Sequence, residues 1–177
     1  MNISRSILLL ALASINNGAQ AAEAESAVPE PHTFVQQAAQ TSLTEIEAAK
    51  VALARSQDPG IRSFAQRMVK DHGQSNIELA SLATVKGIEA PKALDAEHKA
   101  MLDEITSKTG ADFDRSYSEH MQMGHTKAVA LFEAAANSPD AVIANFARKT
   151  LPTLREHRQL AQKLGGAMSK SPDVGGR

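Results

Sequence analysis

Apolar residues recur at helical spacing over most of the chain and predict five helices. The expected ranges are about 33–56, 59–86, 96–108, 111–136 and 139–164. Within each range, apolar side chains return every three or four residues, which places them on one face of a helix. Four long helices joined by short connections pack as antiparallel neighbours. The pattern therefore predicts an all-α antiparallel four-helix bundle with one extra short helix.

Helix-start and helix-stop residues support these ranges. Asp58-Pro59 and Ser138-Pro139 each combine a capping side chain with a proline suited to the first helical position. Gly87 is expected to end the second helix. Pro152 falls inside the last helix and predicts a kink there, because proline removes one backbone hydrogen bond.

The N-terminal residues predict export. A single basic residue, Arg5, precedes a short apolar run that ends in Ala19-Gln20-Ala21. This arrangement is typical of a secretory signal peptide, here residues 1–21, and the run is too short to anchor the chain in a bilayer. We expect a periplasmic protein with a flexible leader at 22–32, the bundle at 33–166 and a disordered tail at 167–177. No transmembrane span is predicted.

Composition removes several classes of function. The chain of 177 residues has a net charge of −1, so it lacks the basic face that nucleic-acid binding needs. It has no cysteine, which excludes disulfides and thiolate metal sites. No phosphate-binding, dinucleotide-binding or nucleophile-elbow motif occurs. No catalytic residue is predicted, and any site must use histidines and carboxylates.

Four such residues fall on or near the apolar faces of the long helices. At about 100° per residue, His72 and His157 lie close to the centre of their apolar stripes, and Glu45 and His125 lie near the edges. Helical bundles build metal sites from side chains on facing helices. The four residues therefore form a candidate site for a transition metal, with zinc, copper and iron as the candidate ions.

The depth of these residues in the bundle is a second test. Counted from the connecting turn at 1.5 Å per residue, Glu45 and His72 agree within roughly 3 Å. His125 and His157 differ by roughly 9 Å if their helices are straight. The predicted kink at Pro152 would have to close this difference.

Two other interpretations remain open. A buried histidine can instead be satisfied by one carbonyl and one carboxylate, with no metal. In addition, the segment from His120 to His125 includes Met121 and Met123. Thioethers and imidazoles suit copper, particularly Cu(I), although methionines on a bundle helix are also typical of core packing.

Several motifs resemble one bacterial family. They are Phe64-Ala-Gln-Arg-Met68-Val-Lys-Asp71-His72 with Asn76, Phe113-Asp114 with Tyr117, His125-x-x-Ala128-x-x-x-Phe132, Phe146-Ala147, and Leu151-Pro152-Thr153-Leu154-Arg155-Glu156-His157. Together they resemble the exported domain-of-unknown-function family 4142 (DUF4142), whose members are often labelled predicted outer-membrane proteins. The resemblance extends from about Phe34 to Leu164.

The resemblance implies a ferritin-like bundle and no established activity. It also implies that the recurrent positions of the family correspond to Glu45, His72, His125 and His157. This chain departs from the family at Gly124, where an acidic residue is common. The Glu-x-x-His pairs of ferritin-like di-iron enzymes are absent, because Val69, Gln122 and Leu154 stand three residues before the histidines.

The sequence thus predicts an exported, soluble bundle protein of the cell envelope. Its inward histidines and glutamate are expected to be structural or to bind a transition metal, and the partner is either a metal ion or an envelope protein. One alternative is a metalloenzyme or metal-storage protein that uses the same residues. Another is a metal-free helical module that binds a partner protein.

Overall fold

The computed structural model describes residues 27–168, and this part of the chain contains five helices and no strand. Four are long: α1 (Pro31–Arg55), α2 (Pro59–Lys86), α4 (Gly110–Ala135) and α5 (Ala141–Met168). The fifth, α3 (Ala96–Thr106), is short. The predicted all-α bundle with one extra short helix is confirmed. The expected signal peptide lies outside the described residues, as does most of the expected tail.

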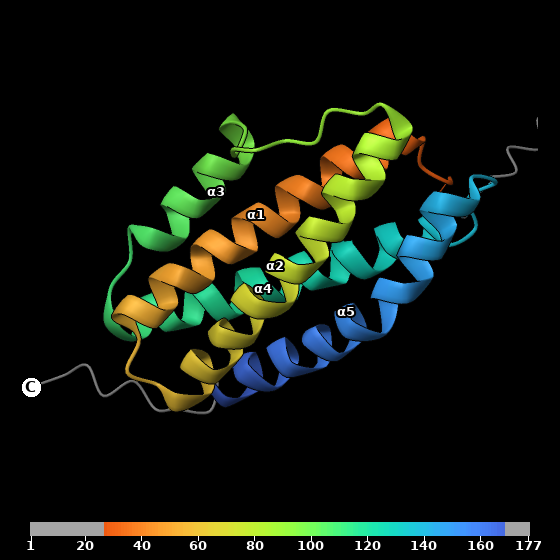
Figure 1. The fold of residues 1–177 in the computed structure, drawn as a ribbon. Coiled ribbons are helices and arrows are strands. Elements are labelled where there is room, and N and C mark those ends of the chain that lie inside the picture. The colour runs from red at the N-terminus through yellow and green to blue at the C-terminus, as the bar shows by residue number, and fades with distance from the viewer. Residues whose placement is uncertain (1–26, 169–177) are drawn as a thin grey trace, which may run out of the picture.

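The bundle consists of two antiparallel hairpins (Figure 1). Helices α1 and α2 form one hairpin, and α4 and α5 form the other, with the most extensive contacts inside each hairpin. The hairpins meet where α1 packs on α4 and α2 packs on α5. Helix α3 lies outside this square, against α1 and α4 (Figure 1). Each long helix therefore presents one face to a shared interior.

Local capping explains where the helices begin and end. The Asp58 carboxylate accepts a hydrogen bond from the backbone N–H of Ile61 at 2.8 Å, as a capping residue should. Gly87 ends α2 at φ 65°, a left-handed conformation that glycine adopts without strain.

The start of α5 differs from the prediction. The helix begins at Ala141, after Pro139. Asp140, rather than Ser138, accepts hydrogen bonds from the N–H groups of Val142 and Ile143 at 3.0 and 3.3 Å. Ser138 instead accepts a bond from the Asp140 N–H at 3.2 Å, which orients the capping residue. At its other end, α5 continues through Gly165 and Gly166, where it was expected to stop.

The interior is divided into two apolar clusters. The first apolar cluster is built around Phe34, Leu79, Phe132, Phe146 and Leu154, and the second around Ala52, Ile61, Phe64, Tyr117 and Ala161. Along every long helix, a buried Glu or His lies between the residues of one cluster and those of the other. These four residues, Glu45, His72, His125 and His157, are called the polar layer below. The polar layer separates two halves of an otherwise apolar core.

No helix between residues 27 and 168 combines the length and the apolar character that crossing a membrane requires.

Candidate metal centre

The structure brings all four predicted residues together in the interior. Their exposed fractions are 3% for Glu45, 5% for His72, 0% for His125 and 1% for His157. The centroids of the three imidazole rings lie 5.3 to 5.6 Å apart. Each long helix supplies one member, so the polar layer forms only when both hairpins have docked.

The predicted difference in depth between His125 and His157 is absent. Their ring centroids are 5.3 Å apart, whereas counting along straight helices gave roughly 9 Å. Helix α5 bends partway along its length (Figure 1), and Pro152 lies inside this helix. A proline leaves the carbonyl four residues earlier without its helical partner, which accounts for a bend.

Glu45 lies between two of the histidines. One carboxylate oxygen, Oε2, is 3.0 Å from Nε2 of His72, and the other, Oε1, is 3.4 Å from Nδ1 of His125. Both oxygens are nevertheless among the buried atoms without a geometrically regular hydrogen-bond partner. The carboxylate is therefore close to the rings, but they do not fill its capacity to accept hydrogen bonds or bind a cation.

Two of the rings are held from outside the layer. Nδ1 of His125 donates to the carbonyl of Met121 at 2.8 Å. Nε2 of His157 donates to Oδ2 of Asp71 at 2.9 Å, and Arg67 approaches the same carboxylate at 3.3 Å. These contacts fix the orientation and tautomer of both imidazoles, so the nitrogen that faces the layer carries a lone pair.

The atoms that face one another across the layer have no hydrogen-bond partner among residues 27–168. They are both carboxylate oxygens of Glu45, Nε2 of His72, Nε2 of His125 and Nδ1 of His157. Buried polar atoms are rarely left unpaired, because each one costs about 1–3 kcal/mol. One nitrogen from each ring lies within 4.8 Å of the other two. A metal ion is a group that can satisfy several such lone pairs at once.

The pKa shifts favour the charge states that ligands need. Burial lowers the pKa of His125, against the opposing influence of Glu45. Burial also lowers the pKa of His157, to about 4, although the hydrogen bond to Asp71 opposes it. For Glu45, burial raises the pKa, but the attraction of His125 and His72 outweighs it, and the pKa lies below its usual range. The lowered pKa values of His125 and His157 favour neutral rings, the form of imidazole that binds a metal, while the attraction that lowers the pKa of Glu45 acts when a neighbouring ring carries a positive charge, a charge that a bound cation would also supply.

Sequence reasoning missed the importance of two neighbours of Glu45. An ideal Cβ on Gly124 would lie 2.8 Å from Oε1 of Glu45, so a larger residue there would collide with the carboxylate. Tyr117 is fully buried, its hydroxyl has no partner, and burial followed by the charge of Glu45 raises its pKa. The sequence signal for Gly124 was its departure from the family pattern, but its consequence depends on how closely α1 and α4 approach.

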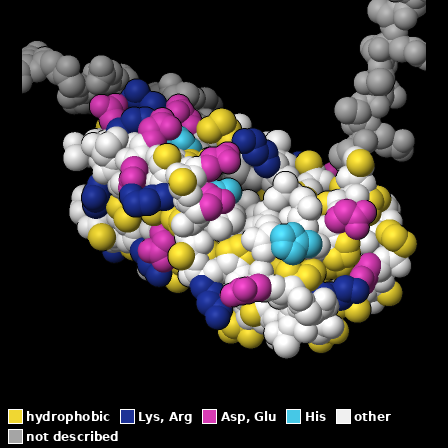
Figure 2. Space-filling view, turned by 90° about the horizontal axis from the view of Figure 1, so that it is seen from above, with side chains coloured by type: hydrophobic (Ala, Val, Ile, Leu, Met, Phe, Trp, Pro, Cys, Tyr) yellow, Lys and Arg dark blue, Asp and Glu magenta, His cyan; other side chains and the backbone are white. Residues whose placement is uncertain are grey.

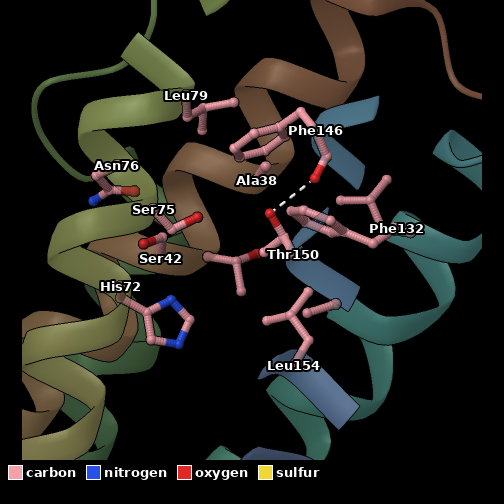
Figure 3. Close-up of a pocket in the computed structure, with 13 residues that line it drawn as sticks. Ala38, Ser42, His72, Ser75, Asn76, Leu79, Phe132, Phe146, Thr150 and Leu154 are labelled. Atoms are coloured by element: carbon pink, nitrogen blue, oxygen red, sulfur yellow. Dashed lines mark hydrogen bonds between the residues drawn. The ribbon is translucent and has the colours of Figure 1, made fainter. Parts of the chain in front are cut away.

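A small space beside His72 opens toward the first apolar cluster. It is a cavity of about 20 Å³ among α1, α2, α4 and α5, with the ring of His72 on one side and Phe132, Phe146 and Leu154 on the other (Figure 3). This volume suits about one water molecule. Ser42, which also lines it, has a buried hydroxyl without a protein partner. This cavity leaves no room for an organic substrate beside His72.

Comparisons with known proteins agree with this fold. The sequence profile of the family described as "Domain of unknown function (DUF4142)" matches residues 16–164. The chain is also similar to a solved structure, a DUF305 fragment from Deinococcus radiodurans, with a TM-score of 0.68 and 20% identity. That match covers 80% of this chain and 98% of the fragment, and it shows a shared fold. No curated protein is significantly similar to the chain.

Proposed function

The chain belongs to the DUF4142 family, which is described only as a domain of unknown function, and we propose that it binds one transition-metal ion in the polar layer. The observation that carries this proposal is that one nitrogen from each of His72, His125 and His157 lies within 4.8 Å of the other two, with the buried carboxylate of Glu45 beside two of these rings, and that all four residues have atoms without a hydrogen-bond partner. Three imidazoles and a carboxylate are a common ligand set for zinc, copper and iron.

The charge of the layer supports a cation as its ligand. Glu45 is buried, its pKa lies below its usual range, and its oxygens lie 3.0 Å from a ring nitrogen of His72 and 3.4 Å from one of His125. Burying an anion without a full set of partners is costly, and a metal ion would offset this cost more effectively than neutral rings do. Asp71 and the Met121 carbonyl would act as the outer partners that orient metal-bound histidines.

Burial favours binding or storage over catalysis. Catalytic metal sites keep an open position that water or substrate can reach. Here the three histidines are at most 5% exposed and the cavity beside His72 suits about one water molecule, while Glu45 is the member of the layer that lines a larger groove between α1, α3 and α4. The layer is therefore suited to holding an ion.

Metal titration of the metal-free protein tests this function. We expect one equivalent of Zn²⁺ or Co²⁺ to bind, and Co²⁺ to give the visible spectrum of a nitrogen- and oxygen-ligated ion. Ligand at 100 times its dissociation constant adds about 2.7 kcal/mol to the free energy of unfolding. The midpoint of thermal unfolding should then rise by about 10 °C.

Variants connect the result to the polar layer. The double variant His72→Gln/His157→Gln should lose the Co²⁺ spectrum and the thermal shift. His32→Gln is the matched control, because His32 is exposed on α1 and away from the layer. Binding that survives in the double variant, or an absence of binding in the natural protein, would overturn the proposal.

We also propose that the chain is exported and acts in the periplasm. The support is the signal-peptide pattern of residues 1–21. Mass spectrometry of protein recovered from the periplasmic fraction should give a chain that starts at residue 22. Full-length protein in the cytoplasm would contradict this.

A further inference from the structure

A groove on the α3 side of the bundle leads toward the polar layer. It has a volume of about 760 Å³ and runs between α1, α3 and α4. Its lining includes Glu45 of the polar layer and Gly124, whose Cβ position lies 2.8 Å from Oε1 of Glu45. Viewed from above, the surface over the α3 half of the molecule carries histidine, acidic and basic side chains (Figure 2). This groove is called the α3 groove below.

Two methionines in the α3 groove are not explained by core packing. Met123 is 53% exposed, and Met101 is only half-buried; neither belongs to an apolar cluster. Met121, in contrast, is 2% exposed and packs in the second apolar cluster. Thioethers outside the core are free to contact a ligand in the groove, and they prefer soft cations such as Cu(I).

Two histidines line the same groove with one ring nitrogen already engaged. Nδ1 of His98 lies 2.8 Å from the Asp95 carboxylate, and Nδ1 of His120 lies 2.8 Å from the carbonyl of Ser116. When Nδ1 donates its proton, Nε2 carries the lone pair that a metal ion uses. Both rings therefore have the tautomer of a metal ligand.

The charges in the groove favour a cation. The acidic residues Asp95, Glu97 and Glu104 line it, together with Glu45, against one lysine, Lys127. A low-dielectric cleft lined by one sign of charge concentrates ions of the opposite sign. The groove thus offers soft ligands, an attractive potential and contact with the polar layer through Glu45.

We propose that the α3 groove captures Cu(I) and passes it to the polar layer. This inference rests on the proposed function and names the ion and its route. The ion exchanges its ligands stepwise among the side chains of Met101, Met123, His98 and His120. The copper remains Cu(I) throughout, so no oxidant or reductant takes part. Gly124 carries no side chain that would separate the groove from the Glu45 carboxylate.

Transfer kinetics test the route. Cu(I) is supplied anaerobically as its coloured bicinchoninate complex to the metal-free full chain, and loss of the colour reports transfer. In Met101→Leu/Met123→Leu, we expect transfer to slow by about tenfold, because leucine keeps the volume but lacks the thioether. Loading of Co²⁺, which does not depend on thioethers, should keep its natural rate in the same variant.

A matched control separates the groove from the core. Met68→Leu makes the same change at a fully buried methionine of the second apolar cluster and should leave Cu(I) transfer unchanged. Equal Cu(I) rates in the natural protein and the double methionine variant would overturn the route. Binding of Co²⁺ without any Cu(I) uptake would overturn this inference and leave the proposed function intact. Failure of every metal to bind would overturn both.

Discussion

At the scale of single residues, Gly124 decides how closely the Glu45 carboxylate can approach α4. In Gly124→Ala the new Cβ would lie 2.8 Å from Oε1 of Glu45, too close for either atom. The carboxylate is the end of a flexible side chain, so it should move while the helices stay in place. We expect metal affinity to fall by about tenfold or more, with little loss of thermal stability, as measured by Co²⁺ titration and thermal unfolding.

Gly73→Ala is the control for this substitution. Gly73 lies on α2, and nothing lies within 4 Å of the position its Cβ would take. Alanine should stabilise α2 by about 0.5–1 kcal/mol and leave metal affinity unchanged. Equal affinity in both variants would show that Gly124 does not position Glu45.

Asp71 acts on the layer through His157. Its carboxylate accepts the Nε2–H of that ring at 2.9 Å, which raises the electron density of the nitrogen that faces the layer. Asp71→Asn keeps the shape but supplies a weaker acceptor. We expect metal affinity to fall by about 10- to 100-fold, measured by competition with a chelator of known affinity.

Glu156→Gln provides the matched test of local charge. Glu156 pairs with Arg67 at 2.7 Å on the surface, next to Asp71. Removing this exposed charge should change stability by less than about 1 kcal/mol and leave affinity as it was. If both variants lose metal affinity equally, Asp71 acts through its negative charge alone and not through its hydrogen bond to His157.

At the scale of elements, capping by side chains contributes measurably to the bundle. The Asp58 carboxylate accepts the N–H of Ile61 at 2.8 Å, whereas Glu30, at the start of α1, makes no such bond. Asp58→Ala should lower the free energy of unfolding by about 1 kcal/mol. Glu30→Ala should change it very little. Urea unfolding of both variants measures the difference, and equal values would contradict it.

The helices could be predicted because their signals are local. Apolar spacing, Asp58-Pro59 and Gly87 each act within a few residues, and the structure confirms the helices they indicated. The predicted start of α5 was wrong because Ser138 and Asp140 can both cap a helix. Which of the two caps α5 depends on the backbone conformation, and in the structure it is Asp140. The bend in α5 was expected from Pro152, but its effect on the depth of His157 depends on how the hairpins cross.

At the scale of the whole molecule, the polar layer is an interruption between two apolar clusters. The angular position of Glu45 and the three histidines could be predicted from residue numbers alone, since 100° per residue fixes the face. Their convergence could not, because it depends on the bend in α5 and on contacts between hairpins. Of the outer partners, the Asp71 carboxylate reaches His157 across two helices and has no sequence signature, whereas the Met121 carbonyl lies one helical turn before His125 on α4.

An unfilled polar layer should make the metal-free protein sensitive to acid. The pKa of His157 is lowered to about 4 in the folded chain, from an ordinary value of 6.5, chiefly by burial. Between these values only the unfolded chain binds the proton, so stability falls as the pH drops through this window and the loss from this ring is complete below it. His157 alone should lower the free energy of unfolding by up to about 3 kcal/mol across this window. The lowered pKa of His125 acts in the same direction.

Glu45 and Asp71 extend the loss to lower pH. Their folded pKa values lie below the ordinary range, so the unfolded chain again binds protons first as the pH falls. Urea unfolding of chelator-treated protein from pH 7.5 to 4 should show a steady decline. His157→Gln should flatten the upper part of this decline, whereas exposed His32→Gln should not. Because His157 is enclosed by both hairpins, a flat profile in the natural protein would mean that the hairpins separate at the layer and admit water before the chain unfolds.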